Sequence, residues 1–197
     1  METIPLFPLG SVLFPQGRMS LQIFEPRYLD LVSQCLKDNS GFGVVWLRQG
    51  SEVYKPQPLV DSRLAQIGCY ATIVDWDKLS NGLLGITIEG GKKFRLLSSH
   101  QQENHLHVAE VEWTKEEPLL QLPEKSEELK ALLLQLLEHP HIARLKLNSD
   151  INDVGTLGHL LAQLLPIEEK LKFELLAMTD PLLRLEKLMG LLDQYSQ

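Results

Sequence analysis

The sequence predicts an α+β protein, in which a β-rich pseudo-barrel with one early helix is followed by a C-terminal helical bundle. Residues 42–113 are short β-branched and aromatic runs separated by turn residues, which is typical of strands. Beyond Pro118, leucines recur at the offsets of three and four that place them on one side of a helix. The composition changes near residue 115, so we expect a β-rich subdomain over residues 1–115 and a helical subdomain over residues 116–197.

The opening segment, residues 1–28, combines large apolar side chains with Pro5, Pro8, Pro15 and Pro26. Proline lacks an N–H group and has a fixed φ, so these positions exclude one long helix and also a central strand. We expect short extended pieces whose apolar side chains are pinned into a core. A helix should then begin at Pro26 and end at residues 38–41, with an apolar stripe made of Tyr28, Leu31, Val32, Cys35 and Leu36.

The strands are predicted from alternation. Residues 42–47 form a short buried run, followed by a turn at residues 49–51 and an exposed loop at residues 55–58. Residues 67–74 alternate with a period of two, and both faces are partly apolar. A strand of this kind is expected to be covered on both sides, as in a barrel or sandwich.

The next strands are separated by glycines. Asn81 and Gly82 suit the positive φ angles of a tight hairpin turn, after which residues 83–89 return as a strand. Gly90 and Gly91 predict a bulge or sharp bend before a further strand. One more strand is expected at residues 105–113, with alternate side chains facing inward, namely His107, Ala109, Val111 and Trp113.

Four helices are predicted in the second half from apolar stripes and helix-capping residues. The first carries Leu129, Leu132, Leu133, Leu136 and Leu137 and ends at residues 139–141. The second is capped by Asp153 and closed by Pro166, with its stripe at Val154, Leu157, Leu160, Leu161 and Leu164. The third starts at Glu168 and Glu169, whose charges suit the helix dipole, and turns inward Leu171, Leu175 and Met178. The fourth starts at residues 179–181, where a capping side-chain oxygen is followed by proline at the first helical position, with its stripe at Leu182, Leu185, Leu188, Met189 and Leu192.

Composition excludes several classes of protein. With a net charge of −7, the chain is not expected to bind nucleic acid. Its two cysteines cannot form a disulfide framework and indicate a reducing compartment. The N-terminus lacks the basic region of a secretory signal, and no apolar run approaches the roughly 18 residues of a membrane span. We therefore expect a soluble cytoplasmic protein.

The sequence contains no recognisable catalytic residues or metal ligands, and it indicates no need for a cofactor. The sequence has no nucleophile elbow, no zinc-protease motif, no phosphate-binding loop and no Cys-x-x-Cys pair. Residues 90–93 have neither the spacing nor the following helix of a nucleotide site. His105 and His107 share a strand face but lack a third metal ligand, and His159 lies between stripe positions and is expected to face solvent. Cys35 and Cys69 are expected to be small buried hydrophobic residues.

Two sets of charged residues can be interpreted either as structural or as functional. Lys92, Lys93 and Arg95 form a basic patch that is expected to be a solvated strand face, although it can also receive an acidic group from a partner. Glu25 and Arg27 flank Pro26 and are expected to pair with each other or with the backbone at the helix start.

The chain resembles the N-terminal domain of Lon proteases from end to end. The resemblance is carried by the strings PLFPLGSVLFP, IFEPRY, GCYATIV, LLGITIEGGKKFRL, LLAQLLP and TDPLLRLEKL, in this order. In that family the domain is a β-rich pseudo-barrel followed by helices, and it precedes the ATPase and the Ser-Lys peptidase. The ATPase motifs and the protease domain are absent from this sequence, so the resemblance implies a non-enzymatic binding role with weak self-association as a further possibility.

The first hypothesis is a module that binds unfolded or apolar polypeptide segments, or a protein partner, in a groove. Exposed apolar patches usually mark partner sites, so we expect a few of five N-terminal residues to be incompletely buried and to line that groove, these five being Leu6, Phe7, Phe14, Phe24 and Tyr28. The alternative for each residue is a place in the core. A second hypothesis is a regulatory adaptor that docks on a protease or another complex through its helical half, and a third is an unrecognised hydrolase.

Overall fold

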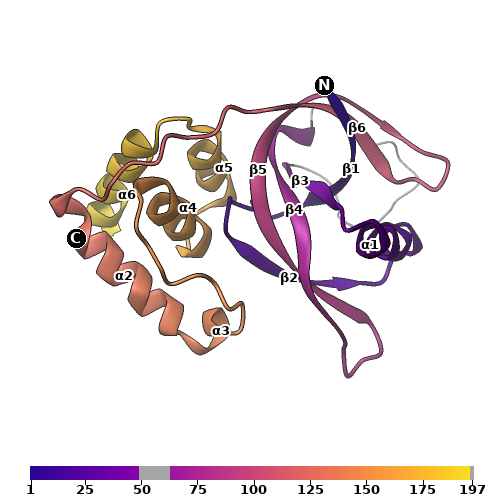
Figure 1. Ribbon diagram of the computed structural model, residues 1–197, viewed down its shortest axis with the longest axis horizontal. Coiled ribbons are helices and arrows are strands. Elements are labelled where there is room, and N and C mark those ends of the chain that lie inside the picture. Colours follow the sequence, from indigo (N-terminus) through magenta and orange to yellow (C-terminus); the bar gives the residue numbers. More distant parts are fainter. Residues whose placement is uncertain (49–62, 196–197) are drawn as a thin grey trace.

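A computed structural model describes residues 1–48 and 63–195 and shows a curled six-stranded sheet beside a group of helices (Figure 1). The strands are β1 (Glu2–Leu9), β2 (Arg18–Ile23), β3 (Gly41–Leu47), β4 (Leu64–Lys78), β5 (Leu84–Gln101) and β6 (His107–Trp113). The helices are α1 (Pro26–Asp38), α2 (Glu127–Glu138), α3 (Pro140–Ala143), α4 (Val154–Leu164), α5 (Glu169–Ala177) and α6 (Pro181–Tyr195), and a short 3-10 helix, η2, spans Glu124–Ser126. This arrangement confirms the predicted α+β class.

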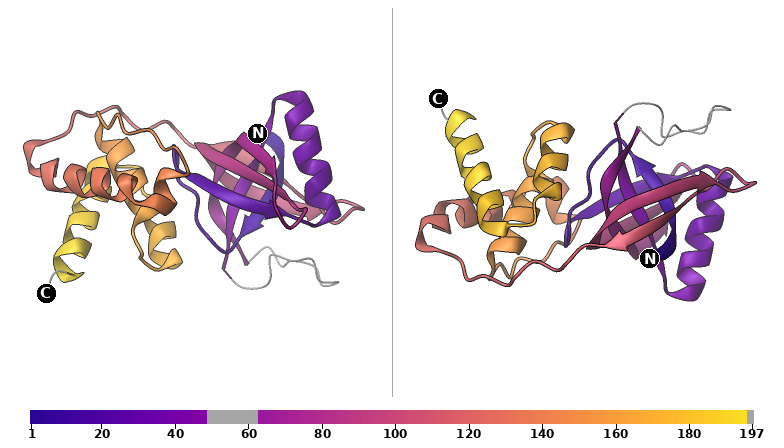
Figure 2. Two further views of the ribbon diagram at one scale, coloured as in Figure 1. Left: turned by 90° about the horizontal axis from the view of Figure 1, so that it is seen from below. Right: turned by 90° about the horizontal axis from the view of Figure 1, so that it is seen from above.

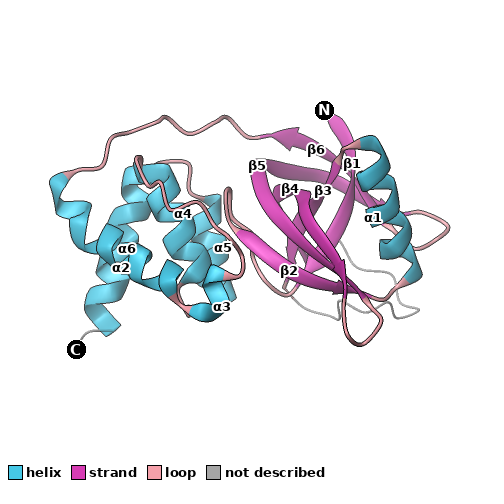
Figure 3. Cartoon of the chain, turned by 60° about the horizontal axis from the view of Figure 1, so that its bottom comes forward, coloured by secondary structure: helices cyan, strands magenta, loops and turns pink. Residues whose placement is uncertain are grey.

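The sheet has the strand order β2-β5-β4-β3-β1-β6, and a further pairing between β5 and β6 closes it into a ring (Figure 3). The ring is possible because β5 changes partner along its length. Its first part, from Leu84 to Glu89, pairs with β2, and its later part, from Phe94 onward, pairs with β6. All neighbours are antiparallel except β1 and β3. The pairing leaves β2 as an additional strand outside the closed ring.

The prediction that Pro5 and Pro8 exclude a central strand is wrong, because β1 contains both prolines and lies between β3 and β6. The reason is a change of partner at Leu6. Residues 2–6 pair with β6, and residues 6–9 pair with β3. Each proline therefore has a paired strand on one side only, and its nitrogen can face the other side without breaking a ladder hydrogen bond.

The first helix begins and ends where the sequence indicates. Pro26 occupies its first turn, and Asn39 ends it in the left-handed conformation with a φ of 50°. Glu25 Oε2 pairs with the Arg27 guanidinium at 2.9 Å, as expected. Leu36 departs from the prediction, because its side chain is 43% exposed.

The strand predictions also hold over most of their length. The turn before β5 has a positive φ at Gly82 but not at Asn81, so it is longer than the expected two-residue hairpin turn. Gly90 and Gly91 lie inside the single strand β5, opposite a register shift in β4, and form a bulge rather than a break. The turn and loop predicted at residues 49–51 and 55–58 lie outside the described residues.

Three hydrophobic clusters form the core. One lies between the sheet and α1, and a second fills the opposite side of the ring around Leu6, Val45 and Phe94. The third joins the helices to the sheet, because Val12 and Phe14 pack among the leucines of α2, α4, α5 and α6. Figure 2 shows from two directions that α1 and the other helices lie at opposite ends of the sheet.

The helical half follows the predicted stripes with small differences. Asp153 caps α4, and its Oδ1 accepts a hydrogen bond from the Thr156 N–H group at 2.9 Å. Leu182 was predicted to face inward on α6 but is 40% exposed. No helix in the described residues is long and apolar enough to cross a membrane. The last strand ends at Trp113 and the first helix of this half begins at Glu127, while the subdomain boundary at residue 115 stays a prediction.

Candidate functional site

The five residues predicted to line a groove are not together on the surface. Leu6 and Phe14 are fully buried, and Tyr28 and Phe7 are only 5% and 6% exposed. Phe7 stacks on Tyr28 with ring centroids 3.9 Å apart, and Phe14 lies in the cluster between sheet and helices. Only Phe24 meets the condition of partial exposure, with 52% of its surface accessible. The other four are core residues.

Phe24 lies at the end of the sheet where further apolar side chains are exposed. It follows Ile23, which pairs with Leu84 of β5, and Leu84 in turn pairs with Lys78 of β4. Two residues further in along the strands, Trp76 pairs with Ile86, and Trp76 is 61% exposed. We call the side chains of this end the hairpin surface: Leu21, Phe24, Trp76 and Leu84.

The hairpin surface exists because β4 and β5 are longer than the core that covers them. Ile86 and Ile88 of β5 are buried under α1, whereas β4 is exposed from Val74 to its end at Lys78. Leu21 and Leu84 are half-buried and pack against that same cluster. The hydrophobic face of the sheet therefore continues from the core to the surface without interruption.

A groove of about 230 Å³ crosses the three strands at the same end. On β5 the groove is lined by Gly85, against which Leu79 packs. A Cβ at this position would lie only 2.8 Å from Leu79 Cδ2, so the glycine leaves room for the leucine side chain. Ser20 and Gln22 line it on β2, and Asp75 and Asp77 line it on β4. The groove thus combines an acidic wall with polar side chains of β2.

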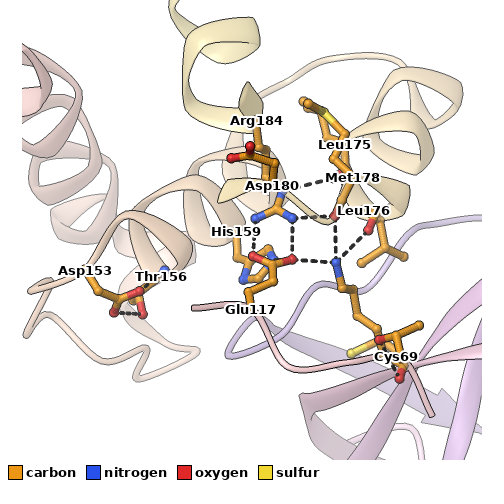
Figure 4. Close-up of polar contacts among 12 residues, drawn as sticks. Cys69, Glu117, Asp153, Thr156, His159, Leu175, Leu176, Met178, Asp180 and Arg184 are labelled. Carbon is orange, nitrogen blue, oxygen red and sulfur yellow. Dashed lines mark hydrogen bonds and ion pairs between the residues drawn. The ribbon is translucent and has the colours of Figure 1, made fainter. Parts of the chain in front are cut away.

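A second polar constellation lies where the helices meet the sheet (Figure 4). Glu117, in the segment after β6, accepts hydrogen bonds from Arg184 of α6 at 2.8 and 2.5 Å and from Lys93 of β5 at 2.5 Å. Lys93 Nζ also donates to the carbonyl oxygens of Leu176 and Met178. Three distant parts of the chain therefore meet at one buried carboxylate.

Lys93 corrects the prediction of a solvated basic patch. Its side chain is 6% exposed and has its acidic partner within the same chain, whereas neighbouring Lys92 pairs with Glu116 at the surface. The alternation of β5 turns Lys93 inward toward the helices, and a buried amino group requires such a partner. Arg95 remains exposed.

The prediction that His159 faces solvent is also wrong, because its side chain is 6% exposed and its Nε2 lies 3.6 Å from Glu117 Oε1. The apolar stripe alone does not predict this burial, because α4 is buried on nearly all sides. The sequence did contain a signal. No residue from Val154 to Leu164 is charged, and a helix that is apolar or small all round is expected to be buried.

Burial and mutual contacts shift the pKa values of this cluster. Burial alone would raise the pKa of Glu117, but its neighbours His159, Arg184 and Lys93 lower it far below its ordinary value. Burial lowers the pKa of His159 to about 4, against the opposing effect of Glu117. Burial also lowers the pKa of Lys93, and Glu117 opposes this shift. At neutral pH, His159 is therefore uncharged and Glu117 is ionised.

A cavity of about 320 Å³ adjoins this cluster, between β5 and the N-terminal end of α4. Its wall includes Gly90, Gly91, Thr114 and the exposed Leu119. Residues 90–93 lie within a strand and do not precede a helix, so they lack the geometry of a phosphate-binding loop. Of the charged residues that line the cavity, Lys93 and Glu117 pair with each other and take part in the contact between the sheet and the helices.

No group of three or more potential metal ligands occurs in the parts of the chain that the structure describes. Cys35 and Cys69 are free and buried, as expected. Burial raises the pKa of the Cys69 thiol to about 12, so this group is a thiol rather than a reactive thiolate at neutral pH.

Comparison with known proteins relates the chain to Lon proteases. Residues 3–194 match the family described as the ATP-dependent protease La (LON) substrate-binding domain. The chain is 28% identical over 200 residues to Lon protease of Bacillus thuringiensis (strain Al Hakam) and 26% identical over 201 residues to Lon protease of Brevibacillus choshinensis. Each alignment covers 96% of this chain and 24% of the relative, so the chain spans about a quarter of those proteins.

Two solved structures have a similar fold. The first is a Lon N-terminal domain protein from Xanthomonas campestris, with 32% identity, a TM-score of 0.74, and 96% of this chain and 98% of that chain covered. The second is the N-terminal domain of Mycobacterium avium complex Lon protease, with 14% identity, a TM-score of 0.62, and 96% and 97% covered. The chain therefore belongs to the Lon substrate-binding domain family.

Proposed function

We propose that this chain is a non-catalytic module that binds unfolded or apolar polypeptide segments at the hairpin surface. The observation that carries the proposal is the exposure of Trp76 and Phe24 at the sheet end where the apolar face of the core reaches the surface. Large aromatic side chains lose little conformational entropy when they bind and contribute strongly to recognition. The match to a substrate-binding domain supports the same role.

The role requires neither a cofactor nor a catalytic group of this chain. It needs an accessible apolar surface and polar groups that can hydrogen-bond a peptide backbone. The hairpin surface supplies the first, and the polar side chains of the groove, on the other face of the same strands, supply the second. A cytoplasmic location belongs to this proposal, and the two buried free thiols are compatible with a reducing compartment.

The proposal is tested by titrating the protein with a fluorescently labelled, reduced and carboxymethylated protein that cannot refold. Trp76→Ala and Phe24→Ala should each weaken binding roughly fivefold or more, which corresponds to about 1 kcal/mol. Leu97→Ala is the matched control, because Leu97 is a 45% exposed apolar residue of β5 outside the hairpin surface. Absence of binding by the unchanged protein at high micromolar concentration refutes the function, and equal binding by all three variants refutes the site.

An adaptor role through the helical half has one favourable observation. Leu182 and Leu183 are adjacent at the start of α6 and are 40% and 53% exposed. A pull-down with crosslinking, comparing the unchanged chain with Leu183→Glu, tests this alternative. Loss of a large partner with the variant supports docking through α6, and an identical set of partners contradicts it.

A further inference from the structure

Strand β2 presents an open backbone edge beside the hairpin surface. Among the described strands, β2 pairs with β5 alone, whereas the others have neighbours on both sides. We propose that β2 receives a short, extended polypeptide segment as an added strand, and that the segments preferred are those in which every second residue is apolar. This inference rests on the proposed polypeptide-binding function and specifies the conformation and sequence pattern of the ligand.

The hydrogen bonds at the start of β2 determine which of its backbone groups face outward. Gln16 has a φ of 63°, its N–H group donates to the Gly90 carbonyl, and the Gly90 N–H group donates to the Gly17 carbonyl. This is the pattern of a bulge in which two residues oppose one. Counting from Gly17 in steps of two, the antiparallel register directs Met19, Leu21 and Ile23 toward β5.

The intervening residues Ser20 and Gln22 therefore point their N–H and C=O groups away from β5. Outside the strand ladders, no backbone hydrogen bond of the described residues involves Ser20 or Gln22. An exposed row of donors and acceptors is a template for a further strand, and peptides that bind in this way gain affinity from backbone hydrogen bonds.

The open edge is bounded at both ends, and this limits what can occupy it. At one end the Arg18 guanidinium donates to the carbonyl oxygens of Leu145 and Lys146, which brings the loop after α3 against the strand. At the other end the chain leaves the sheet at Phe24 and enters α1. Only two outward-facing residues lie between these limits. Pairing over so short an edge buries far less than the ~800 Å² per partner of a stable dimer, which favours one peptide segment over a second copy of this chain.

The side chains of β2 indicate the sequence pattern of the segment. Met19 and Leu21 lie on the face of the sheet that covers the core under α1, and both are only half-buried. An added strand places alternate side chains beside them on this face, where apolar groups extend the hydrophobic core. Its remaining side chains lie on the opposite face, next to Ser20 and Gln22, and can be polar.

Charge excludes acidic occupants from the same edge. Asp75 and Asp77 stand two strands inward on the face that carries Ser20 and Gln22, and the whole chain has a net charge of −7. The Lys146 ammonium nearest Asp75 is 3.9 Å away and well exposed, so it neutralises little of this charge. A second copy of an acidic chain is therefore repelled, whereas a neutral or basic segment is not.

The first experiment removes the outward-facing N–H groups one at a time by substituting proline. Ser20→Pro and Gln22→Pro each remove one donor that the fold does not use, and proline is tolerated at such edge positions. Ser20→Ala and Gln22→Ala are the matched controls, because they remove the same side chains and keep the N–H groups. With the unfolded protein as ligand, each proline variant should bind at least fivefold more weakly than its alanine counterpart, with unchanged circular dichroism.

The second experiment uses the unchanged protein, so it does not depend on how the variants fold. The ligand is a short lysine-flanked peptide in which valine and threonine alternate, N-methylated at one or the other set of alternate amides. Strand addition predicts that N-methylation of one set of alternate amides abolishes binding, whereas N-methylation of the other set does not. It also predicts that the bound peptide slows hydrogen exchange at the Ser20 and Gln22 amides. Equal affinities of the two peptides, or unchanged exchange when the peptide is bound, overturn strand addition.

The outcomes separate this inference from the function on which it rests. Binding of the unfolded protein that is equal in proline and alanine variants refutes strand addition and leaves the binding function standing. Failure of the unchanged protein to bind any unfolded chain refutes the function itself. Protection of Ser20 and Gln22 that rises with protein concentration in the absence of peptide shows that a second copy occupies the edge, and overturns the inference.

Discussion

Arg184 and Glu117, which are 67 residues apart in the chain, form a two-pronged ion pair inside the protein. Both guanidinium Nη atoms donate to the Glu117 carboxylate, and the Arg184 side chain is fully buried. Arg184 Nε and Nη2 also donate to the carbonyl oxygens of Leu175 and Met178. Because Lys93 of β5 binds the same carboxylate, the pair connects the helical half to the sheet and fixes their relative positions.

Replacing Glu117 by glutamine should destabilise the protein strongly. The change leaves two buried cations, Lys93 and Arg184, without their counterion, and breaking a buried pair in this way costs about 3 kcal/mol or more. The measurement is urea unfolding followed by circular dichroism. Glu116→Gln is the control, because Glu116 pairs with Lys92 at the exposed surface, where solvent screens the pair. Equal urea midpoints for the two variants would contradict this role of Glu117.

Stability should fall as the pH is lowered from about 6.5 to 4. The unfolded chain protonates His159 near its ordinary pKa of 6.5, whereas burial keeps the folded pKa at about 4. The unfolded state therefore binds more protons in this window, and acidification favours it by at most about 1.4 kcal/mol per pH unit. The lowered pKa of Glu117 acts in the same direction at lower pH, because below its ordinary 4.5 the unfolded chain takes up a proton while the folded carboxylate stays ionised.

The pH effect is checked by comparing urea midpoints of the unchanged protein and His159→Gln at a series of pH values. The variant should show a flatter profile between pH 6.5 and 4, because the replacement side chain does not titrate. His141→Gln serves as the control, since His141 is exposed. Parallel profiles for all three proteins would show that His159 does not cause the loss of stability.

The pairing of Glu117 with Lys93 and Arg184 illustrates what the sequence does not reveal. The limits of α1 and α4 follow from local chemistry at Pro26, Asn39 and Asp153, and the sequence predicts them correctly. Which side of β5 faces the helices depends on how two halves of the chain dock, and no local pattern encodes this. Lys93 and His159 were therefore assigned to solvent, although both are buried.

Four of the five candidate binding residues are buried for a related reason. Alternation identifies an apolar face, but it does not show whether another layer covers that face. Leu6 is buried in the cluster around Val45 and Phe94, and Phe7 is buried against Tyr28 of α1, whereas Phe24 is exposed. Trp76 was not predicted because it follows a bulge near Val74 that disturbs the alternation of β4. Its signal in the sequence is a tryptophan between two aspartates near a turn, which is typical of an exposed strand end.

Gly90→Ala should destabilise the protein by roughly 1–3 kcal/mol or more, a cost typical of overpacking. A Cβ at this position would lie 2.1 Å from the Phe14 carbonyl oxygen, and a backbone atom cannot move aside cheaply. Gly91→Ala is the matched control, because its Cβ would have only the Tyr70 carbonyl oxygen within contact range, at 3.4 Å. Thermal unfolding measures both. Similar melting temperatures for the two variants would show that the approach of Phe14 to β5 is not tight.

Phe14→Ala should mainly lower stability, whereas Phe24→Ala should mainly weaken polypeptide binding. Phe14 is fully buried among the helices, so its truncation should lower the free energy of unfolding by about 3–5 kcal/mol. Phe24 is 52% exposed, and its truncation should change stability by roughly 0.5 kcal/mol or less while weakening polypeptide binding. Urea unfolding and the unfolded-protein titration measure the two effects separately. A large loss of stability in Phe24→Ala would assign Phe24 to the core, and its effect on binding would then be indirect.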